Sequence, residues 1–259
     1  MPRTNDPGRS VSSRVFDLLF AFGPDHSALT LAELERRTGL SHATARRLLG
    51  ELVGAGLLER GADGRFTIGL RLWRLGTLAP HTESLRTLAQ PFMEDLYAAL
   101  KQHVQLAVLR NDEAVIIDRR SAPSAVRVVS GVGGRLPLHS SAVGKVLLSH
   151  ADAARIDAVL ARPLRAYTPD TITDPERIRA ELAACRQTGI AKVRGELTPG
   201  VDSVATRILD SSGRVVAALS VLVDGRRVHL SAAEMTLFAS GLGISRLLGW
   251  RPGVQARVG

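Results

Sequence analysis

The sequence predicts an α+β fold in two parts, and three observations support this expectation. Three short amphipathic helical segments and an alternating hairpin occupy the first seventy residues. Farther along the chain, strand-like runs meet in hairpin turns, which indicates an antiparallel sheet with helices outside rather than a parallel one. The length of 259 residues favours two domains over one.

Composition excludes several classes of protein. Hydrophobic residues make up 45% of the chain and charged residues 23%, as in ordinary globular proteins. Cys185 is the only cysteine, so neither an intrachain disulfide nor a cysteine-based zinc site can form. The polar first ten residues lack the apolar core of a secretion signal, and no apolar run is long enough to span a bilayer. We therefore expect a cytoplasmic protein without a membrane partner.

The first predicted helix begins at Ser12 or Ser13, either of which can cap its free amides. Apolar side chains recur at three- and four-residue spacing between Val15 and Phe22, which makes one buried face. Gly23 follows and ends the helix.

A second and a third helix follow, separated by a glycine turn. Thr30 and Glu33 fit a capping box at the start of the second helix, which ends near Thr38. Gly39 supplies the turn, and Ser41 caps the third helix. Helix, tight turn and helix is the helix-turn-helix arrangement, whose second helix enters the DNA major groove with its N-terminal end first.

The third helix has one apolar face and one small or polar face, and the polar face carries the candidate DNA contacts. Arginine suits guanine edges or phosphates, and threonine suits a phosphate or a thymine methyl. The candidate residues are Ser41, His42, Ala43, Thr44, Arg46 and Arg47. A solvated helix face is the alternative explanation for the two arginines.

A hairpin directly after the third helix is predicted to form a wing. Two short alternating strands flank Asp63-Gly64, a sequence typical of tight hairpin turns. Arg60 and Arg65 flank the turn and are candidates for phosphate or minor-groove contact. Residues 1–69 are thus interpreted as a winged helix-turn-helix DNA-binding domain. The alternative is a three-helix core with a hairpin that mediates only protein contacts.

Charge does not locate the DNA-binding surface. The formal net charge is +9, but residues 1–80 carry 11 Arg and 8 Asp or Glu, and residues 81–259 carry 23 Lys or Arg and 17 Asp or Glu. The positive excess is therefore spread over both parts, and the geometry of the motif carries the interpretation.

The rest of the chain begins with a helical linker, residues 70–81, whose Trp73 would be buried by a second chain or by the wing. Further helices are expected over residues 84–101, 141–148, 175–188 and 232–248. Strands are expected over residues 104–109, 114–119, 126–129, 191–197, 201–209 and 215–223. Asp210–Gly213 forms a hairpin turn between the last two strands, and a glycine-rich turn is expected over residues 131–134.

The loop that enters the predicted helix at about Ser141 is the strongest candidate for a small-molecule site. A loop that runs into a helix N-terminus offers free amides and a favourable dipole to an anion. Ser140, Ser141 and the amides of Ala142 and Val143 can hold a carboxylate. A serine N-cap without a ligand is the alternative. His139 is also counted among the effector-binding residues, and it is expected to fix the loop by hydrogen bonding.

An enzyme is not favoured. Gly144-Lys145 is not a phosphate-binding P-loop, because the residue five positions before Gly144 is His139 instead of glycine. The histidines are not at metal-ligand spacing, and no acidic partner is indicated for His139 and Ser140. We therefore expect no catalytic residue, no metal and no cofactor. Two alternatives stay open: a ligand-processing enzyme with the helix-turn-helix as an adaptor, and a helix-turn-helix used only for assembly.

Motifs along nearly the whole chain resemble the IclR family of bacterial transcription regulators. In the first part the matching residues are Leu31-Ala32-Glu33-Leu34, Thr38-Gly39-Leu40, Thr44, Arg47-Leu48-Leu49, Gly56-Leu57 and Asp63-Gly64-Arg65-Phe66. In the second part they are Pro137-Leu138-His139, Gly144-Lys145, Tyr167-Thr168, Thr171-Ile172-Thr173 and Pro199-Gly200-Val201. Several spaced motifs in family order are more specific than one helix-turn-helix match.

The resemblance implies both architecture and partners. It implies a winged helix-turn-helix, a linker helix, and a GAF-like effector-binding and oligomerisation domain over residues 82–259. It also implies a homodimer, possibly paired into a tetramer, that binds pseudo-palindromic double-stranded operator DNA. A small-molecule effector, expected to be a carboxylic acid, would control this repressor or activator.

The resemblance also adds four pocket residues by position, namely Val193, Ser203, Ser220 and Leu222. Val193 stands where aspartate is frequent in the family, Ser203 where cysteine is frequent, and Leu222 where serine is frequent. Two of these differences remove polar groups, so a small oxoacid would leave hydrogen bonds unmade at about 1–3 kcal/mol each. We therefore expect a larger, partly apolar ligand, such as an aromatic or acyl acid. A vestigial pocket is the alternative.

Overall fold

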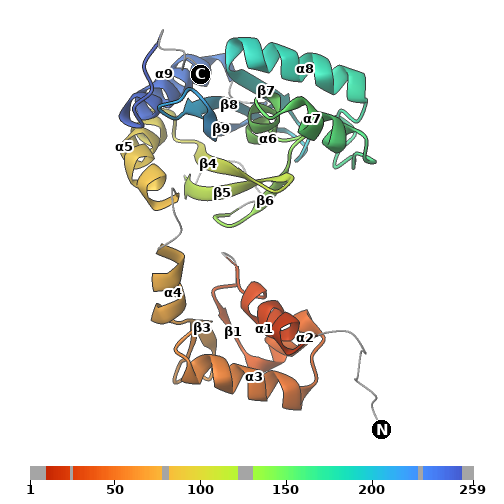
Figure 1. The fold of residues 1–259 in the computed structure, drawn as a ribbon, viewed down its shortest axis with the longest axis vertical. Coiled ribbons are helices and arrows are strands. Elements are labelled where there is room, and N and C mark those ends of the chain that lie inside the picture. Colours follow the sequence, from red (N-terminus) through yellow and green to blue (C-terminus); the bar gives the residue numbers. More distant parts are fainter. Residues whose placement is uncertain (1–9, 24–25, 78–81, 122–130, 227–229, 253–259) are drawn as a thin grey trace, which may run out of the picture. The chain divides into compact units, whose positions relative to one another are not determined.

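The computed structural model describes residues 10–23, 26–77, 82–121, 131–226 and 230–252 (Figure 1). The chain divides into two units, residues 1–83 and 84–259. The strand expected over residues 126–129 lies outside the described residues, as do residues 78–81 of the expected linker. Within the described part, no helix is both long and apolar enough to cross a bilayer.

In the N-terminal unit, the first three helices pack on a small antiparallel sheet. Its first three helices are α1 (Val11–Phe20), α2 (Leu31–Thr38) and α3 (His42–Gly54). The sheet has the order β1-β3-β2, with β1 (Ala28–Leu29), β2 (Leu58–Arg60) and β3 (Phe66–Ile68). α4 (Leu70–Thr77) follows the hairpin. This arrangement confirms the predicted helix-turn-helix with a wing.

Local capping determines the turn between α2 and α3. Glu33 Oε2 accepts the Thr30 amide hydrogen at 2.7 Å, and Thr30 Oγ1 accepts the Glu33 amide hydrogen at 3.3 Å, so the predicted capping box is present. Gly39 ends α2 with φ at 68°, a conformation that favours glycine. Leu34 and Leu48 then pack into one core from the two helices.

The C-terminal unit is a six-stranded antiparallel sheet with helices on both faces (Figure 1). Its strand order is β6-β5-β4-β9-β8-β7. The strands are β4 (His103–Arg110), β5 (Glu113–Arg120), β6 (Arg135–Pro137), β7 (Ile190–Arg194), β8 (Val201–Leu209) and β9 (Val215–Asp224). This topology confirms the α+β class.

Each face of this sheet has its own apolar core. One face packs against α5 (Thr82–Leu100) and α9 (Leu230–Leu247). The other packs against α6 (Ala142–Ser149), α7 (Ala153–Leu160) and α8 (Pro175–Thr188). Because side chains alternate along a strand, Leu106 of β4 joins the α5 and α9 core, whereas Ala107 joins the α6 core.

The sequence prediction was wrong at the start of α1 and did not include three short elements. Ser10, rather than Ser12 or Ser13, caps α1, because its Oγ accepts the Ser13 amide hydrogen at 3.0 Å. β1 and β6 have two and three residues, too few to show a period. α7 follows Asp152, whose carboxylate accepts the Arg155 amide hydrogen at 2.7 Å.

Candidate functional site

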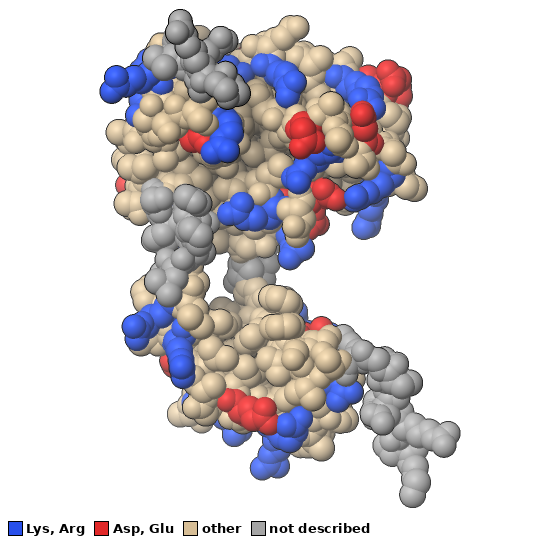
Figure 2. Space-filling model, in the orientation of Figure 1, with Lys and Arg blue, Asp and Glu red and all other residues tan. Residues whose placement is uncertain are grey.

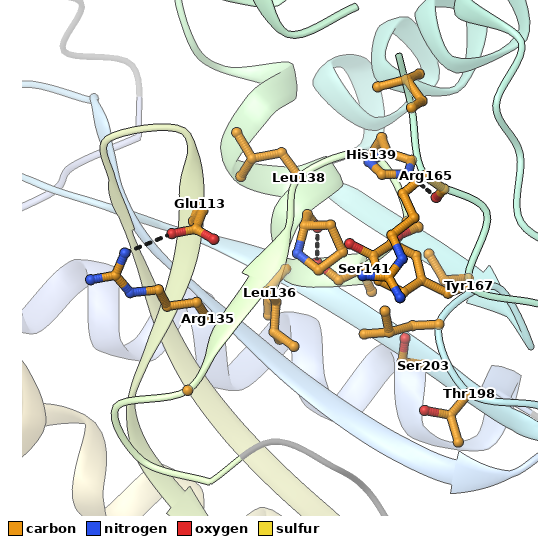
Figure 3. A pocket seen from close by; sticks show the side chains of 18 of the residues that line it. Glu113, Arg135, Leu136, Leu138, His139, Ser141, Arg165, Tyr167, Thr198 and Ser203 are labelled. Atoms are coloured by element: carbon orange, nitrogen blue, oxygen red, sulfur yellow. Dashed lines mark hydrogen bonds and ion pairs between the residues drawn. The ribbon is translucent and has the colours of Figure 1, made fainter. Parts of the chain in front are cut away.

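A cavity of about 610 Å³ lies in the C-terminal unit between the sheet and the start of α6 (Figure 3). This volume is within the range of small-molecule sites. The cavity brings together all nine residues proposed from the sequence as effector contacts: His139, Ser140, Ser141, Ala142, Val143, Val193, Ser203, Ser220 and Leu222. It also includes residues that the sequence analysis missed, among them Gln105, Arg165, Tyr167 and Thr198.

Neighbouring strands supply the floor of this cavity. Val193, Ser203 and Leu222 form one row across β7, β8 and β9, because Val193 pairs with Ser203 and Ser203 pairs with Leu222. Ser220 of β9 pairs with Gln105 of β4 in a second row. Both residues of this second row are buried. The first row therefore combines two apolar side chains with one hydroxyl, whereas Gln105 and Ser220 of the second row are both polar.

Ser141 and Ser140 have different roles at the start of α6. Ser141 Oγ accepts the Gly144 amide hydrogen at 3.1 Å and donates to the Pro137 carbonyl oxygen at 2.6 Å. Ser141 is thus an N-cap whose hydroxyl is already used, which is the alternative that the sequence left open. Ser140 Oγ, by contrast, is fully buried and has no hydrogen-bond partner among the described residues.

Three hydrogen-bond donors have no acceptor, among the residues that the structure describes, at the wall of the cavity that the start of α6 forms, which we call the α6 wall. The amides of Ala142 and Val143 belong to the first turn of α6, where a helix provides no internal acceptor. Ser140 Oγ is the third donor. On the floor, Ser220 Oγ is also buried without a partner in the described part of the chain. An unsatisfied buried hydroxyl costs about 1–3 kcal/mol, so these groups are suited to bind a ligand.

His139 ties the loop before α6 to the rim of the cavity. Its Nε2 lies 3.0 Å from the carbonyl oxygen of Arg165. Since a carbonyl oxygen only accepts, Nε2 carries the hydrogen. Burial lowers the pKa of His139, the hydrogen bond to Arg165 opposes this shift, and the charge of Lys145 lowers the pKa further. The imidazole is therefore neutral at pH 7 and holds the rim in place.

A buried ion-pair network holds the same helix from behind. Lys145 Nζ donates to Glu196 Oε1 at 2.5 Å and to Glu181 Oε2 at 2.6 Å. The Lys145 and Glu196 side chains are only 2% and 4% exposed. Glu196 Oε2 also accepts the Ile172 amide hydrogen at 3.3 Å. The network therefore links α6, α8 and the loop that follows β7.

In the N-terminal unit, α3 buries its apolar face and exposes the other, as predicted. The buried residues are Ala45, Leu48, Leu49 and Leu52. The exposed candidates for DNA contact are His42, Ala43, Arg46 and Arg47, and the half-buried ones are Ser41 and Thr44. Ser41 Oγ donates to Thr44 Oγ1 at 2.9 Å, so its side chain does not cap the helix as predicted, although Ser41 is the N-cap residue. Figure 2 shows basic side chains projecting from the part of this unit where α3 lies.

Two candidates on α3 have partners within the unit. His42 Nδ1 lies 2.8 Å from Glu35 Oε1 of α2. Arg47 Nη1 donates to Glu51 Oε1 at 2.5 Å, and both of these side chains are more than half exposed. Exposed ion pairs contribute about 0–1 kcal/mol. A phosphate or a base edge can therefore compete for Arg47.

The two wing arginines differ in orientation. Arg60 is exposed, with its guanidinium 5.5 Å from the centre of the Phe66 ring. Arg65 Nη1 donates to the Ala28 carbonyl oxygen at 3.1 Å and to Glu33 Oε2 at 3.3 Å. Arg65 was a candidate for phosphate or minor-groove contact, and the structure adds a role that was not foreseen, because its guanidinium anchors the wing to β1 and α2. The acceptor on β1 was not foreseen because that strand was not predicted.

A winged helix-turn-helix in one unit and a small-molecule cavity in the other define a class of protein, the ligand-responsive transcription regulators. The chain belongs to the IclR family: residues 12–62 match the IclR helix-turn-helix domain, and residues 78–240 match the domain described as bacterial transcriptional regulator IclR C-terminal.

Similar proteins agree with this assignment. An HTH-type transcriptional regulator of Mycobacterium tuberculosis is 32% identical over 98% of this chain and 97% of its own length. The Pca regulon regulatory protein of Pseudomonas putida is 32% identical over 94% of this chain and 84% of its own. The crystal structure of an IclR homolog of Microbacterium hydrocarbonoxydans complexed with 4-hydroxybenzoate is 35% identical, with a TM-score of 0.85, and the match covers 92% of this chain and 99% of that one. The protein is thus a transcription regulator and not an enzyme.

Proposed function

We propose that an aromatic carboxylic acid with a second polar group is the effector of this regulator. The observation that carries the proposal is the position of the unused buried hydroxyls. Ser140 lies beside the free amides of α6, which suit a carboxylate, and Ser220 lies on the floor, where it suits a neutral hydroxyl. Apolar side chains line the cavity as well, including Leu136, Leu138, Val159, Leu197, Val201 and Leu222.

Two further features favour a ring over a two-carbon acid. Val193 is 3% exposed and presents only methyl groups from β7, and Leu222 adds an aliphatic side chain from β9. Burying apolar ligand surface against them contributes about 25 cal/mol per Å². The solved relative from Microbacterium hydrocarbonoxydans supports the same ligand class, because it holds 4-hydroxybenzoate.

Replacing Ser140 with alanine tests the site. We expect Ser140→Ala to weaken 4-hydroxybenzoate binding by about ten- to 150-fold, because a hydrogen bond to a charged group is worth about 1.5–3 kcal/mol. Isothermal titration calorimetry on the full chain measures the change. The same titrations of the wild type with glyoxylate and pyruvate compare small acids with the aromatic one.

Ser149→Ala is the matched control for this experiment. Ser149 is a buried serine at the far end of α6, but its Oγ donates to the Val146 carbonyl oxygen at 2.8 Å and the residue does not line the cavity. The affinity of the Ser149→Ala variant for 4-hydroxybenzoate should equal that of the wild type. Tight binding of glyoxylate with no binding of aromatic acids would contradict the proposed effector class.

We also propose that a homodimer of this chain binds a pseudo-palindromic operator. Exposed apolar side chains on α4 support a second copy: Leu70, Trp73 and Leu75 are 62%, 60% and 56% exposed. The proposed DNA contacts are made by Ser41, His42, Ala43, Thr44, Arg46 and Arg47, with Arg60 from the wing. Arg65 is assigned to holding the wing. The effector acts through different affinities for the two arrangements of the dimer.

Replacing Arg47 tests the DNA-binding surface. Arg47→Ala should weaken binding to the DNA upstream of the protein's own gene by about 1–3 kcal/mol if the guanidinium contacts a base. Fluorescence anisotropy at several salt concentrations measures the affinity and the salt slope. Glu51→Gln should instead strengthen binding to the same DNA, because it removes the carboxylate that pairs with Arg47 at 2.5 Å and competes with the DNA for it.

Arg214→Ala is the control, since this arginine is exposed, pairs with Asp210, and belongs to the C-terminal unit. Its DNA affinity should match that of the wild type. An Arg47→Ala protein that binds the operator as tightly as the wild type would remove Arg47 from the interface.

A further inference from the structure

We propose that Arg165 determines specificity at the rim of the effector cavity by supplying the positive charge that selects an anionic ligand over a neutral ligand of the same shape. The inference rests on the proposed effector class, because it concerns how the same cavity recognises a carboxylate. It adds a side chain that lies outside the motifs of the chain and that acts through a positive charge held over the Tyr167 ring.

The charges at the rim leave one cation uncompensated. Arg135 Nη1 lies 3.0 Å from Glu113 Oε2, and Arg162 Nη1 lies 2.8 Å from Asp112 Oδ2. All four residues line the cavity together with Arg165. No carboxylate pairs with Arg165 in the part of the chain that the structure describes. The lining therefore carries one more positive than negative charge, and that charge belongs to Arg165.

Two contacts hold Arg165 beside the wall that offers the free amides. His139, the residue before Ser140, binds the Arg165 carbonyl oxygen through Nε2 at 3.0 Å. The Arg165 guanidinium lies 5.1 Å from the centre of the Tyr167 ring, and this ring is 6.1 Å from that of His139. Figure 3 shows the Arg165 and Tyr167 side chains together beside the loop that leads into α6. Stacking on an aromatic ring limits the freedom of the guanidinium without using its hydrogens.

The charge of Arg165 is expected to affect the preference for anionic over neutral ligands more than the affinity for ligands in general. Arg165 is exposed, so water and salt screen its field, and a neutral ligand gains almost nothing from it. An anionic ligand at the α6 wall gains the attraction, and its loss is expected to reduce the preference for the anion by about two- to fivefold. Stacking also sets the geometry, so a lysine at this position should restore only part of the preference.

The test compares one acid with its neutral amide. Dissociation constants for 4-hydroxybenzoate and 4-hydroxybenzamide are measured by calorimetry on the full-length wild type, Arg165→Met, Arg165→Lys and Arg155→Met. We expect the acid-to-amide preference to fall about two- to fivefold in Arg165→Met and to recover partly in Arg165→Lys. Arg155→Met is the control, because Arg155 donates to the Asn111 carbonyl oxygen and does not line the cavity. Added salt should reduce the preference in the wild type more than in Arg165→Met.

The outcomes separate this inference from the proposed function. If wild type and Arg165→Met bind the acid with the same preference over the amide, the role of Arg165 is overturned while the effector class stands. If Arg165→Met weakens acid and amide equally, the residue shapes the cavity and does not select charge, which also overturns the inference. A wild type that binds neither compound overturns both proposals.

Discussion

Replacing Lys145 with methionine is expected to lower the free energy of unfolding of the C-terminal unit by about 3–5 kcal/mol, because it leaves buried Glu196 without its counter-charge. Lys145 Nζ is the partner of Glu196 at 2.5 Å, and the two side chains are 2% and 4% exposed. Chemical denaturation followed by circular dichroism measures the loss. Hydrogen exchange of the α6 amides shows whether the loss is centred on this helix.

A second lysine in the chain provides the control for this prediction. Lys192 Nζ lies 2.7 Å from Glu234 Oε2, but the Lys192 side chain is 46% exposed. Lys192→Met should therefore cost only about 0–1 kcal/mol. The double variant Lys145→Met with Glu196→Gln should recover part of the loss, because no unpaired carboxylate remains buried. Equal losses for the two single lysine variants would contradict the role assigned to the buried network.

The network matters for the cavity because it reaches the loops that line it. Thr171 Oγ1 donates to the Glu196 carbonyl oxygen at 2.5 Å, and Thr168 Oγ1 donates to the Gly195 carbonyl oxygen at 2.8 Å. These hydrogen bonds join the segment that contains Tyr167 to the segment that leads to Leu197, and both residues line the cavity. We expect Lys145→Met to weaken effector binding as well as stability, although Lys145 does not itself line the cavity.

Elements whose signals lie within a few residues of sequence were predictable. The capping box of Thr30 and Glu33 and the turn at Gly39 are local, and the structure contains both. The orientation of Arg65 was not predictable, because its acceptor on Ala28 is 37 residues away in a two-residue strand. A strand of that length has no period to recognise.

The candidate site shows the same division. The loop of His139 and Ser140 could be recognised as a helix entry from its own residues, whereas the strand residues of the floor came only from the family resemblance. Gln105 was missed although its signal was present: it is the polar residue in the otherwise apolar run of residues 104–109 in β4, and it is 1% exposed. The contribution of Arg165 depends on its stacking with Tyr167 and on its carbonyl contact with His139, 26 residues earlier. Sequence spacing contains no information about such contacts.

Replacing Gly144 with alanine should have the second large effect, a loss of affinity for 4-hydroxybenzoate of about five- to 150-fold, from overpacking that costs about 1–3 kcal/mol. An added Cβ at Gly144 would lie 2.5 Å from the Pro137 carbonyl oxygen and 2.6 Å from Leu138 Cα. Both atoms belong to the backbone, so the first turn of α6 or the end of β6 must move. Calorimetry on Gly144→Ala measures the affinity, and thermal unfolding measures the accompanying loss of stability.

Gly50→Ala distinguishes this close contact from the general effect of alanine in a helix. Nothing lies within 4 Å of a Cβ placed at Gly50 of α3, so that variant should gain about 0.5–1 kcal/mol from helix propensity. If Gly144→Ala also gained stability and kept its affinity for 4-hydroxybenzoate, the close approach of Gly144 to the Pro137-Leu138 backbone would have no role in ligand binding. Gly144 is within a helix and does not have the positive φ that would itself demand glycine. Glycine is required here because α6 must lie against the Pro137-Leu138 backbone, and this contact sets where the amides of Ala142 and Val143 meet the cavity.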